Sequence, residues 1–412
     1  MRTVLHSDLN NFYASVECSL NPALKGHPVA VCGDPEKRHG IVLAKNYEAK
    51  AFGVQTGEAL WQARQKCPDI IFVPPHYDIY MEYSDKTRKI YAEYTDQVEP
   101  FGLDECWLDV TGSKMLFGGG CEIADEIRER IKKELGVTVS IGVSFNKIFA
   151  KLASDMRKPD KTTVIAKDTF RETVWPLPVS DLLYVGRATA KKLALYGIYN
   201  IGQLAMTDER LIDQLLGKNG LMLLKFARGE DSAPVRNIAA KTVVKSVSCG
   251  HTAYRDLKTE EDVKILIITL ATKVSQRLRE YGFDCSCVQL QMRETNLNTF
   301  DRQCRLSYPC RTAEEIYKAA FMLYKKNAAG RTLRSISVHA CDLTYNETEQ
   351  LSFSPEIYKI QRREQLEKAF DEINSKFGCG TVTRGVLLTD PQLAEIGLKS
   401  TPGILPGKMY DI

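Results

Sequence analysis

The pattern of apolar and polar positions at the start of the chain predicts a strand followed directly by a helix. Residues 3–9 have the pattern of a buried strand. In residues 10–20 the apolar side chains of Phe12, Val16 and Leu20 recur at helical spacing, and an Asn-Pro pair follows. The first strand therefore leads into a helix with almost no loop between them.

The alternation of strands and helices continues after this first helix. Two short apolar runs precede a helical pattern over 57–66, which indicates a small inserted subdomain. A long amphipathic helix is expected over 77–97, and it leads into two short strands about a turn at Asp104 and Glu105. The remaining elements of this α+β unit are expected at 29–31 and 41–43 (strands), 121–135 (helix), 138–144 (strand), 146–156 (helix) and 162–166 (strand).

The pattern changes in the second half of the chain. Short helices separated by glycines continue to about residue 231, which predicts a separate, all-helical domain. Residues 232–244 are expected to form a linker, and beyond it strands and helices follow in β-α-β-β-α-β order. The elements expected there are a strand from 245, helix 259–281, strands 285–293 and 302–308, helix 312–328, strand 334–343 and a last helix 355–377.

Length and composition fit a soluble globular protein of several domains. At 412 residues the chain exceeds what one hydrophobic core usually serves. Apolar residues make up 44% of the chain, and no run of about 18 apolar residues suggests a membrane span. The N-terminus lacks the apolar region and cleavage site of a signal peptide. We therefore expect a cytoplasmic protein with no membrane segment.

Cysteine spacing and the distribution of charge indicate the state of the cysteines and the kind of partner to expect. The 12 cysteines are scattered without any Cys-x-x-Cys pair, so free thiols are expected rather than a zinc site or a disulfide framework. The net charge of +4 decides little, but residues 241–340 carry 17 Lys and Arg against 10 Asp and Glu. One basic module on a nearly neutral chain is typical of a protein with a polyanion partner.

Three acidic side chains are the strongest candidates for chemistry. Asp8 lies where the first strand ends, and Asp104 and Glu105 lie at the hairpin turn. Carboxylates that point into one space raise each other's pKa unless a cation neutralises them, and an all-oxygen ligand set favours Mg²⁺ over zinc. Two such ions about 4 Å apart would hold the attacking and the leaving oxygen of a phosphoryl transfer. From spacing alone, an N-cap at Asp8 and ordinary turn chemistry at the acidic pair stay open.

The sequence around these acids resembles a known enzyme family. The motifs that carry the resemblance are HSDLNNFYASVE at 6–17 and VEPFGLDE at 98–105. They are similar to motifs of the Y-family translesion DNA polymerases of the DinB type, and the likeness extends over roughly 1–390. It implies an α+β multidomain, right-hand polymerase. The implied domains are a palm at 1–10 and 77–166, small fingers at 11–76, a helical thumb at 167–231, a linker at 232–244, a β-α-β-β-α-β little finger at 245–345 and a tail at 346–412.

The resemblance also implies the metal ligands and the reaction. Two Mg²⁺ ions would be held by Asp8, Asp104, Glu105 and the backbone carbonyl of Leu9. The reaction would be template-directed addition of deoxynucleotides to the 3′-hydroxyl of a primer. Small fingers leave few residues to close over the new base pair, so low fidelity on undamaged DNA is expected, together with synthesis past damaged bases.

Five residues match positions that bind the incoming nucleotide in this family: Phe12, Tyr13, Tyr47, Lys50 and Lys158. The resemblance makes Tyr13 the steric gate, whose ring would exclude a 2′-hydroxyl. The other polar side chains would contact the triphosphate and stabilise the charge that develops on it. A core position for Tyr13 and plain surface charge for the two lysines are the alternatives.

Four positions depart from the usual family pattern. Lys50 stands where an arginine is usual, Ala44 where a threonine is common, Gly102 in place of a serine and Asn10 in place of a second acid. A lysine keeps a phosphate contact but loses the planar guanidinium. None of the four removes a member of the acidic trio, so these departures bear on nucleotide affinity and damage preference.

Two segments are expected to hold DNA. A thumb segment resembles a helix-hairpin-helix, in which Gly186 and Lys191 would contact a phosphate. Tyr184 stands where a first glycine is usual, and a plain interhelical turn is the alternative. Lys245 and Ser246 open the basic module and match the strand with which little-finger domains follow the DNA backbone.

A short segment after the little finger suggests a protein partner. Gln350, Leu351 and Phe353 resemble the peptide by which bacterial polymerases bind the sliding clamp, although the segment is one residue shorter than the common form. The expected partners are therefore primer-template DNA, dNTPs and a sliding clamp, with the chain itself a monomer. A palm-type nucleotide cyclase and a catalytically silent DNA-binding protein are the alternative functions.

Overall fold

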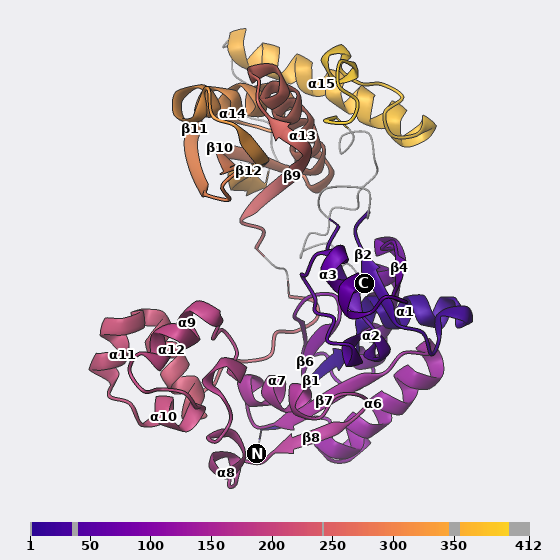
Figure 1. Cartoon of the computed structure of the whole chain (residues 1–412), viewed down its shortest axis with the longest axis vertical. Helices are drawn as coiled ribbons and strands as arrows, with labels where there is room; N and C mark the ends of the chain where they lie inside the picture. Colours follow the sequence, from indigo (N-terminus) through magenta and orange to yellow (C-terminus); the bar gives the residue numbers. More distant parts are fainter. Residues whose placement is uncertain (1, 35–39, 241–242, 346–354, 395–412) are drawn as a thin grey trace. The chain divides into compact units, whose positions relative to one another are not determined.

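The computed structural model describes residues 2–34, 40–240, 243–345 and 355–394 (Figure 1). The chain divides into two compact units after Ala240. Among the described residues, no helix has both the length and the apolar character needed to cross a lipid bilayer.

The first unit is built around a five-stranded sheet in which β1 is the central strand. The strand order is β5-β6-β1-β7-β8. β1 runs antiparallel to both of its neighbours, whereas β7 and β8 are parallel. The strands are β1 (Val4–Leu9), β5 (Val98–Pro100), β6 (Glu105–Asp109), β7 (Val139–Ser144) and β8 (Thr162–Ile165).

Helices cover both faces of this sheet, and successive side chains of β1 point to opposite faces. The helices are α4 (Tyr77–Ala92), α5 (Lys114–Phe117), α6 (Gly120–Leu135) and α7 (Lys147–Met156). Leu5 and Leu9 share a core with α4 and α6, whereas Val4 packs with Ala150 of α7. Asp8 has the same parity as Val4, so its carboxylate points to the α7 face.

A close backbone contact fixes α7 against the sheet. A Cβ atom at Gly142 of β7 would lie 2.0 Å from the carbonyl oxygen of Ala150 and 2.5 Å from the backbone nitrogen of Ser154. Only a residue without a side chain fits between β7 and α7 at this point. Gly142 therefore sets the distance between the sheet and the helix that faces Asp8.

A smaller sheet and a helical group complete the first unit. The small sheet has the order β3-β2-β4 and encloses its own core with α2 and α3. Its elements, with the helices that precede and follow them, are α1 (Phe12–Leu20), η1 (Pro22–Leu24), β2 (Val29–Cys32), β3 (Val42–Lys45), α2 (Tyr47–Ala51), α3 (Leu60–Lys66) and β4 (Ile71–Val73). The helical group consists of α8 (Phe170–Val174), η2 (Val179–Asp181), α9 (Arg187–Ala194), α10 (Ile201–Met206), α11 (Glu209–Leu216) and α12 (Lys218–Ala227).

Two helices are shorter than the sequence pattern predicted. α4 ends at Ala92 instead of residue 97, because the next residues turn toward β6: the Thr95 hydroxyl donates to the Asp109 carbonyl at 2.8 Å. α3 begins at Leu60 instead of residue 57, since Gly57 has a φ of +86° that a right-handed helix does not allow.

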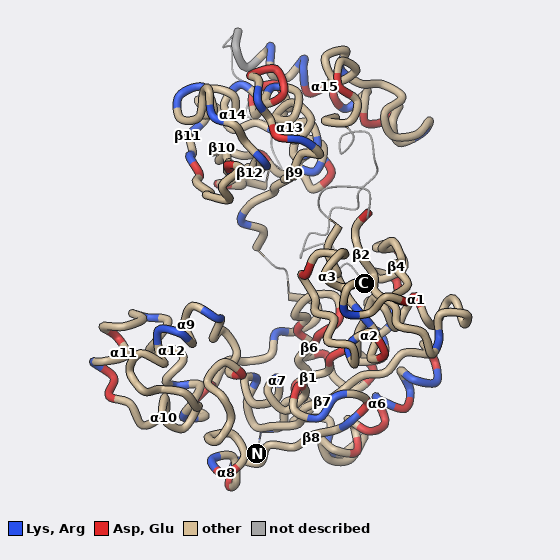
Figure 2. Tube along the Cα trace, viewed as in Figure 1, with Lys and Arg blue, Asp and Glu red and all other residues tan. Residues whose placement is uncertain are grey.

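The second unit contains a four-stranded antiparallel sheet with the order β11-β10-β12-β9. Two helices pack on it and share its apolar core. The elements are β9 (Ser246–Leu257), α13 (Glu260–Tyr281), β10 (Phe283–Glu294), β11 (Thr299–Cys310), α14 (Ala313–Ala328) and β12 (Leu333–Tyr345). The expected β-α-β-β-α-β order is confirmed. In Figure 2, Lys and Arg lie along β11 and just before β9.

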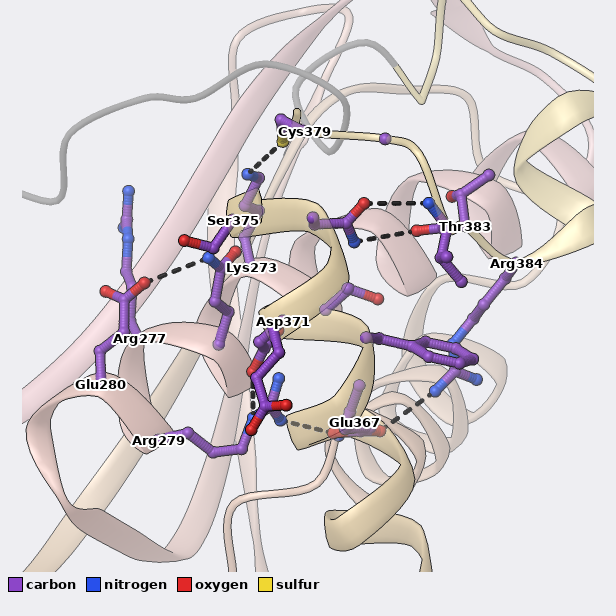
Figure 3. A pocket seen from close by; sticks show the side chains of 18 of the residues that line it. Lys273, Arg277, Arg279, Glu280, Glu367, Asp371, Ser375, Cys379, Thr383 and Arg384 are labelled. Carbon is purple, nitrogen blue, oxygen red and sulfur yellow. Dashed lines mark hydrogen bonds and ion pairs between the residues drawn. The ribbon is translucent and has the colours of Figure 1, made fainter. Parts of the chain in front are cut away.

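The C-terminal helix α15 (Pro355–Phe377) belongs to the second unit. Arg279 of α13 forms ion pairs with Glu367 at 2.5 Å and with Asp371 at 2.7 Å. The following segment, beyond the last helix expected from the sequence, contains η3 (Gly385–Leu388) and adds Leu387 to the core. A cavity of about 920 Å³ lies between α13, α15 and this segment, and Figure 3 shows its mixture of charged side chains.

Candidate active site

The backbone brings the three predicted carboxylates together at one end of the central strands. β1 and β6 pair so that Asp8 lies opposite Glu105. The Leu9 N–H donates to the Asp104 carbonyl at 2.9 Å, which holds the turn before β6 against the end of β1. Gly102, with a φ of +93°, allows the chain to make this turn. The acidic trio therefore shares one site.

Two lysines, Lys151 and Lys158, form ion pairs with two members of the trio and offset part of its negative charge. Lys158 Nζ lies 2.8 Å from Asp8 Oδ2, and Lys151 Nζ lies 2.9 Å from Glu105 Oε1 and 3.3 Å from Asp8 Oδ2. Both ammonium groups also contact Asp155, Lys151 at 3.2 Å and Lys158 at 2.8 Å. The sequence predicted Lys158 but not Lys151 or Asp155. The helical spacing of 151 and 155, which puts both on the face of α7 that Asp8 approaches, was the available signal.

The pKa values in the trio reflect burial and mutual repulsion. Burial and the neighbouring carboxylates of Asp8 and Glu105 raise the pKa of Asp104 to about 6. Burial also raises the pKa of Asp8, although Lys158 and Lys151 act in the opposite direction. Beneath the site, burial and then Lys151 lower the pKa of His6 to about 3. His6 is therefore neutral and does not offset the negative charge above it.

The trio suits a hard divalent cation, although the described residues hold no ready-made group of three His, Cys, Asp or Glu ligands. Glu105 Oε2 is buried and accepts no hydrogen bond from the residues that the structure describes. His6 Nε2 lies 3.4 Å from this oxygen, but the His6 ring carries no positive charge at neutral pH. An orphaned carboxylate oxygen beside an acid with a raised pKa is relieved when a cation binds.

Tyr13 lies next to the trio in a cluster of aromatic rings. Its ring stacks on Tyr80 of α4, with 4.2 Å between the ring centroids, and meets the edge of Tyr77 at 6.0 Å. Burial raises the pKa of Tyr13 to about 12, with smaller contributions from Tyr77 and Asp104. Phe12, in contrast, is 4% exposed, so its ring is part of the core.

The predicted triphosphate ligands of the fingers lie on the short helix α2. Its first residue, Tyr47, is half-buried, and its pKa is raised by burial and influenced by Lys158 and Asp8. Lys50 is exposed, with its Nζ 5.5 Å from the centre of the Tyr47 ring. The amide of Asn46 caps this helix by accepting the Ala49 N–H at 3.0 Å. The cap fixes the direction in which Tyr47 leaves the small sheet.

The predicted DNA-contact residues of both units are exposed. Gly186 is exposed and precedes α9, and Lys191 is exposed on that helix. Tyr184, in the place of the usual glycine, adopts a φ of +70°, a left-handed backbone conformation that glycine adopts more readily than tyrosine. Lys245 and Ser246 are exposed at the start of β9 in the second unit.

The predicted clamp-binding residues Gln350, Leu351 and Phe353 lie outside the described residues. The cavity in Figure 3 contains none of the predicted site residues.

Comparison with known proteins shows which family the chain belongs to. Residues 7–155 match the impB/mucB/samB family, and residues 244–353 match the impB/mucB/samB family C-terminal domain. A DNA polymerase IV of Acetivibrio thermocellus is 47% identical over 397 residues, which cover 96% of this chain and 100% of that protein. DNA polymerase IV 1 of Bacillus subtilis is 36% identical, over 94% of this chain and 93% of its own length.

A solved structure has the same fold. A Y-family DNA polymerase chimera superposes with a TM-score of 0.75 and 26% sequence identity, and the match covers 84% of this chain and 100% of that chain. The fold class expected from the sequence, a multidomain right-hand polymerase, is thereby confirmed. The chain therefore belongs to the DNA polymerase IV family, the DinB type of the Y-family polymerases, which carry out template-directed translesion DNA synthesis.

Proposed function

We propose that this polymerase joins deoxynucleotides to a primer by two-metal nucleotidyl transfer at Asp8, Asp104 and Glu105. The observation that carries the proposal is the register of β1 and β6, in which Asp8 lies opposite Glu105. In the reaction, the primer 3′-hydroxyl oxygen forms a bond to the α-phosphorus of the nucleotide, and the bond to pyrophosphate breaks. The hydroxyl proton leaves to solvent or to a nearby base.

The acidic trio and the carbonyl of Leu9 would hold two Mg²⁺ ions. The all-oxygen donor set, the orphaned Glu105 Oε2 and the raised pKa of Asp104 support this assignment. When bound, such ions supply Lewis-acid activation of the primer hydroxyl and neutralise charge on the leaving pyrophosphate.

Tyr13 would select the sugar of the incoming nucleotide. Its ring stacks on Tyr80 and makes a T-shaped contact with Tyr77, so it has little freedom to move away from a 2′-hydroxyl. A clash of this kind rejects the wrong substrate without needing a stronger contact to the right one. Phe12 would contribute by packing against Tyr13 at 5.4 Å, instead of by contact between its ring and the nucleotide.

Lys158, Tyr47 and Lys50 would bind the triphosphate. Lys158 already forms an ion pair with Asp8, and Tyr47 lies near enough to Lys158 and Asp8 for both charges to influence the pKa of its hydroxyl. Cations near the β- and γ-phosphates stabilise the negative charge that grows on the leaving group.

The domain borders and partners follow the same proposal. Each of the three sheets lies inside one implied range, which supports a palm at 1–10 and 77–166, fingers at 11–76 and a little finger at 245–345. The helices from α8 to α12 lie inside the implied thumb at 167–231, and a linker would follow at 232–244. Gly186, Lys191, Lys245 and Ser246 would contact the backbone of primer-template DNA. Gln350, Leu351 and Phe353 in the tail would bind a sliding clamp. The chain would act as a monomer in the cytoplasm.

Primer extension with the purified full chain tests the proposal. We expect Mg²⁺-dependent extension with dNTPs on undamaged and abasic templates, and frequent misincorporation on the undamaged one. Asp104→Ala should abolish extension while leaving DNA binding intact. Extension that survives this substitution would refute the assignment, and cyclic nucleotide formation without a primer would favour a cyclase.

A further inference from the structure

Asn10, the first residue after β1, holds a buried network of hydrogen bonds. The side chain is 1% exposed. Its Nδ2 donates to the Ser140 hydroxyl at 2.9 Å, and its Oδ1 accepts from the Thr138 hydroxyl at 3.1 Å. The same Oδ1 accepts the backbone N–H of Asp160 at 2.9 Å. Asn10 therefore joins the end of β1 to the segment between α7 and β8.

Asp160 fastens the same segment to α6 from the other side. Its carboxylate accepts Arg128 Nη2 at 2.9 Å and Lys132 Nζ at 3.0 Å, and its carbonyl accepts a second bond from Arg128 at 2.8 Å. Arg128 and Lys132 are one turn apart on α6, so both reach one carboxylate. Burial would raise the pKa of Asp160, but these two cations outweigh it and lower the pKa. Asp160 stays charged at neutral pH.

Lys158 lies between this anchor and α7. It precedes Asp160 by two residues, and its Nζ reaches Asp8 Oδ2 and Asp155 Oδ1, each at 2.8 Å. A lysine carries its ammonium group on a flexible four-carbon chain, so the position of this group depends on how firmly the backbone is held. On the C-terminal side of Lys158, the hydrogen bonds of Asp160 hold the backbone two residues away.

We propose that Asn10 is a positioning residue for Lys158: by holding the Asp160 N–H, it aims the Lys158 ammonium at the phosphates of the incoming nucleotide. This inference rests on the proposed role of Lys158. The part of Asn10 that matters is the oxygen that accepts from Asp160. An aspartate at this position would still accept from Asp160, Thr138 and Ser140, because all three can donate. An alanine would leave the part-buried Asp160 N–H without this acceptor.

The test measures dNTP affinity without chemistry, on the full chain bound to a primer that ends in a dideoxynucleotide. Asn10→Ala should raise the Kd for the correct dNTP about tenfold, and Lys158→Met at least as much. The double variant should match Lys158→Met within about twofold, because a residue that acts through Lys158 has nothing left to position once the ammonium is gone. Asn10→Asp should restore most of the affinity lost in Asn10→Ala.

Two controls separate positioning from general damage. Ser113→Ala removes another buried hydrogen bond, from the Ser113 hydroxyl to the Tyr94 carbonyl, and should leave the Kd unchanged. Asp160→Asn weakens the anchor from the α6 side and should raise the Kd even where Asn10→Ala folds poorly. If Lys158→Met does not change the Kd, the proposed role of Lys158 is wrong. If Lys158→Met weakens binding and the effects of Asn10→Ala multiply with it, or Asn10→Asp behaves like Asn10→Ala, the positioning role is wrong.

Discussion

The rings of Tyr13 and Tyr80 lie face to face, 4.2 Å apart and within 13° of parallel. Tyr80 is fully buried on α4, and its hydroxyl donates to Glu17, which lies one turn after Tyr13 on α1. His76 contacts the same carboxylate at 2.9 Å. Tyr13, the proposed sugar gate, therefore lies between α1 and α4, and the buried hydrogen bond from Tyr80 to Glu17 joins these two helices.

Shortening Tyr13 should admit ribonucleotides. In Tyr13→Ala the ratio of kcat/KM for a deoxynucleotide to that for the matching ribonucleotide should fall at least about tenfold, because the steric clash is lost. Single-nucleotide extension with both sugars measures the ratio. Tyr91→Phe is the control, since it removes only the hydroxyl that donates to Ser7. An unchanged ratio in Tyr13→Ala would exclude Tyr13 as the gate.

Divalent metal should stabilise the protein through the acidic trio. Mg²⁺ at about 100 times its Kd should add ~3 kcal/mol to the free energy of unfolding of the first unit, and EDTA should reverse the effect. Asp104→Asn should lose most of this gain and lower kcat by about 10³. Thermal unfolding and primer extension measure the two effects. The control Glu93→Gln changes an exposed carboxylate paired with Arg130, and it should retain both the metal stabilisation and the kcat. Equal metal stabilisation of Asp104→Asn and Glu93→Gln would rule out the trio as the site.

Gly142 should tolerate no side chain. In Gly142→Ala the added methyl meets the backbone of α7 at 2.0 Å, which should cost about 3 kcal/mol of stability and displace Lys151 and Asp155. Denaturant unfolding of the variant measures the cost. Gly112→Ala is the matched control, because nothing lies within 4 Å of its added Cβ, and it should stay within about 0.5 kcal/mol of the parent. Equal stability of the two variants would contradict the packing of α7.

The second unit should lose stability in acid through Asp262. The Arg255 guanidinium lowers the pKa of Asp262, burial acts against it, and the Thr259 N–H adds to the lowering. A carboxyl with a lowered folded pKa stabilises above its unfolded value, near pH 4, and the contribution is lost as pH falls below that. Asp262→Asn should therefore cost about 1 to 2 kcal/mol at pH 7 and progressively less below pH 4. Hydrogen exchange of the α13 amides in the full chain measures this.

The control for this pH effect is Glu261→Gln, next to Asp262 in the same helical turn. Its carboxylate makes only an exposed pair with Lys264 at 3.3 Å, so the change should be small at every pH. A cost of Asp262→Asn that does not shrink in acid would show that the carboxylate charge is not its source.

DNA binding should depend on salt through the basic module. The logarithm of affinity should fall linearly with the logarithm of salt concentration, and Lys245→Ala should reduce the slope by about 1 with little change in sequence preference. Fluorescence anisotropy with primer-template DNA measures the slope. Lys325→Ala removes the same charge from a lysine paired with Glu260 at 2.6 Å on the helical side of the unit, and its slope should equal the parent's. Equal slopes for both variants would remove Lys245 from the DNA contact.

The sequence predicted the parts of this molecule that depend on local pattern. The period of the apolar residues was enough to find β1 and the helix that begins at Phe12, and the order of elements in the second unit, because each buries one face. Asp8 and the Asp104-Glu105 turn were found because chemistry-bearing acids stand at the ends of strands. Long-range contacts gave no such signal. The ion pair of Lys151 with Asp8 and the hydrogen bond between Asp160 and Asn10 join segments 143 and 150 residues apart, so only the fold brings them together.

The lysines on the α7 side of the trio affect how a metal ion would bind to its carboxylates. Asp8 is bonded to two ammonium groups and Glu105 to one. A cation that bound Asp8 Oδ2 or Glu105 Oε1 would have to displace an ammonium group from that oxygen, whereas Glu105 Oε2 could accept a cation without such an exchange. A released Lys158 is free to turn toward the phosphates that arrive with the nucleotide, so metal and nucleotide would assist each other's entry through one shared side chain.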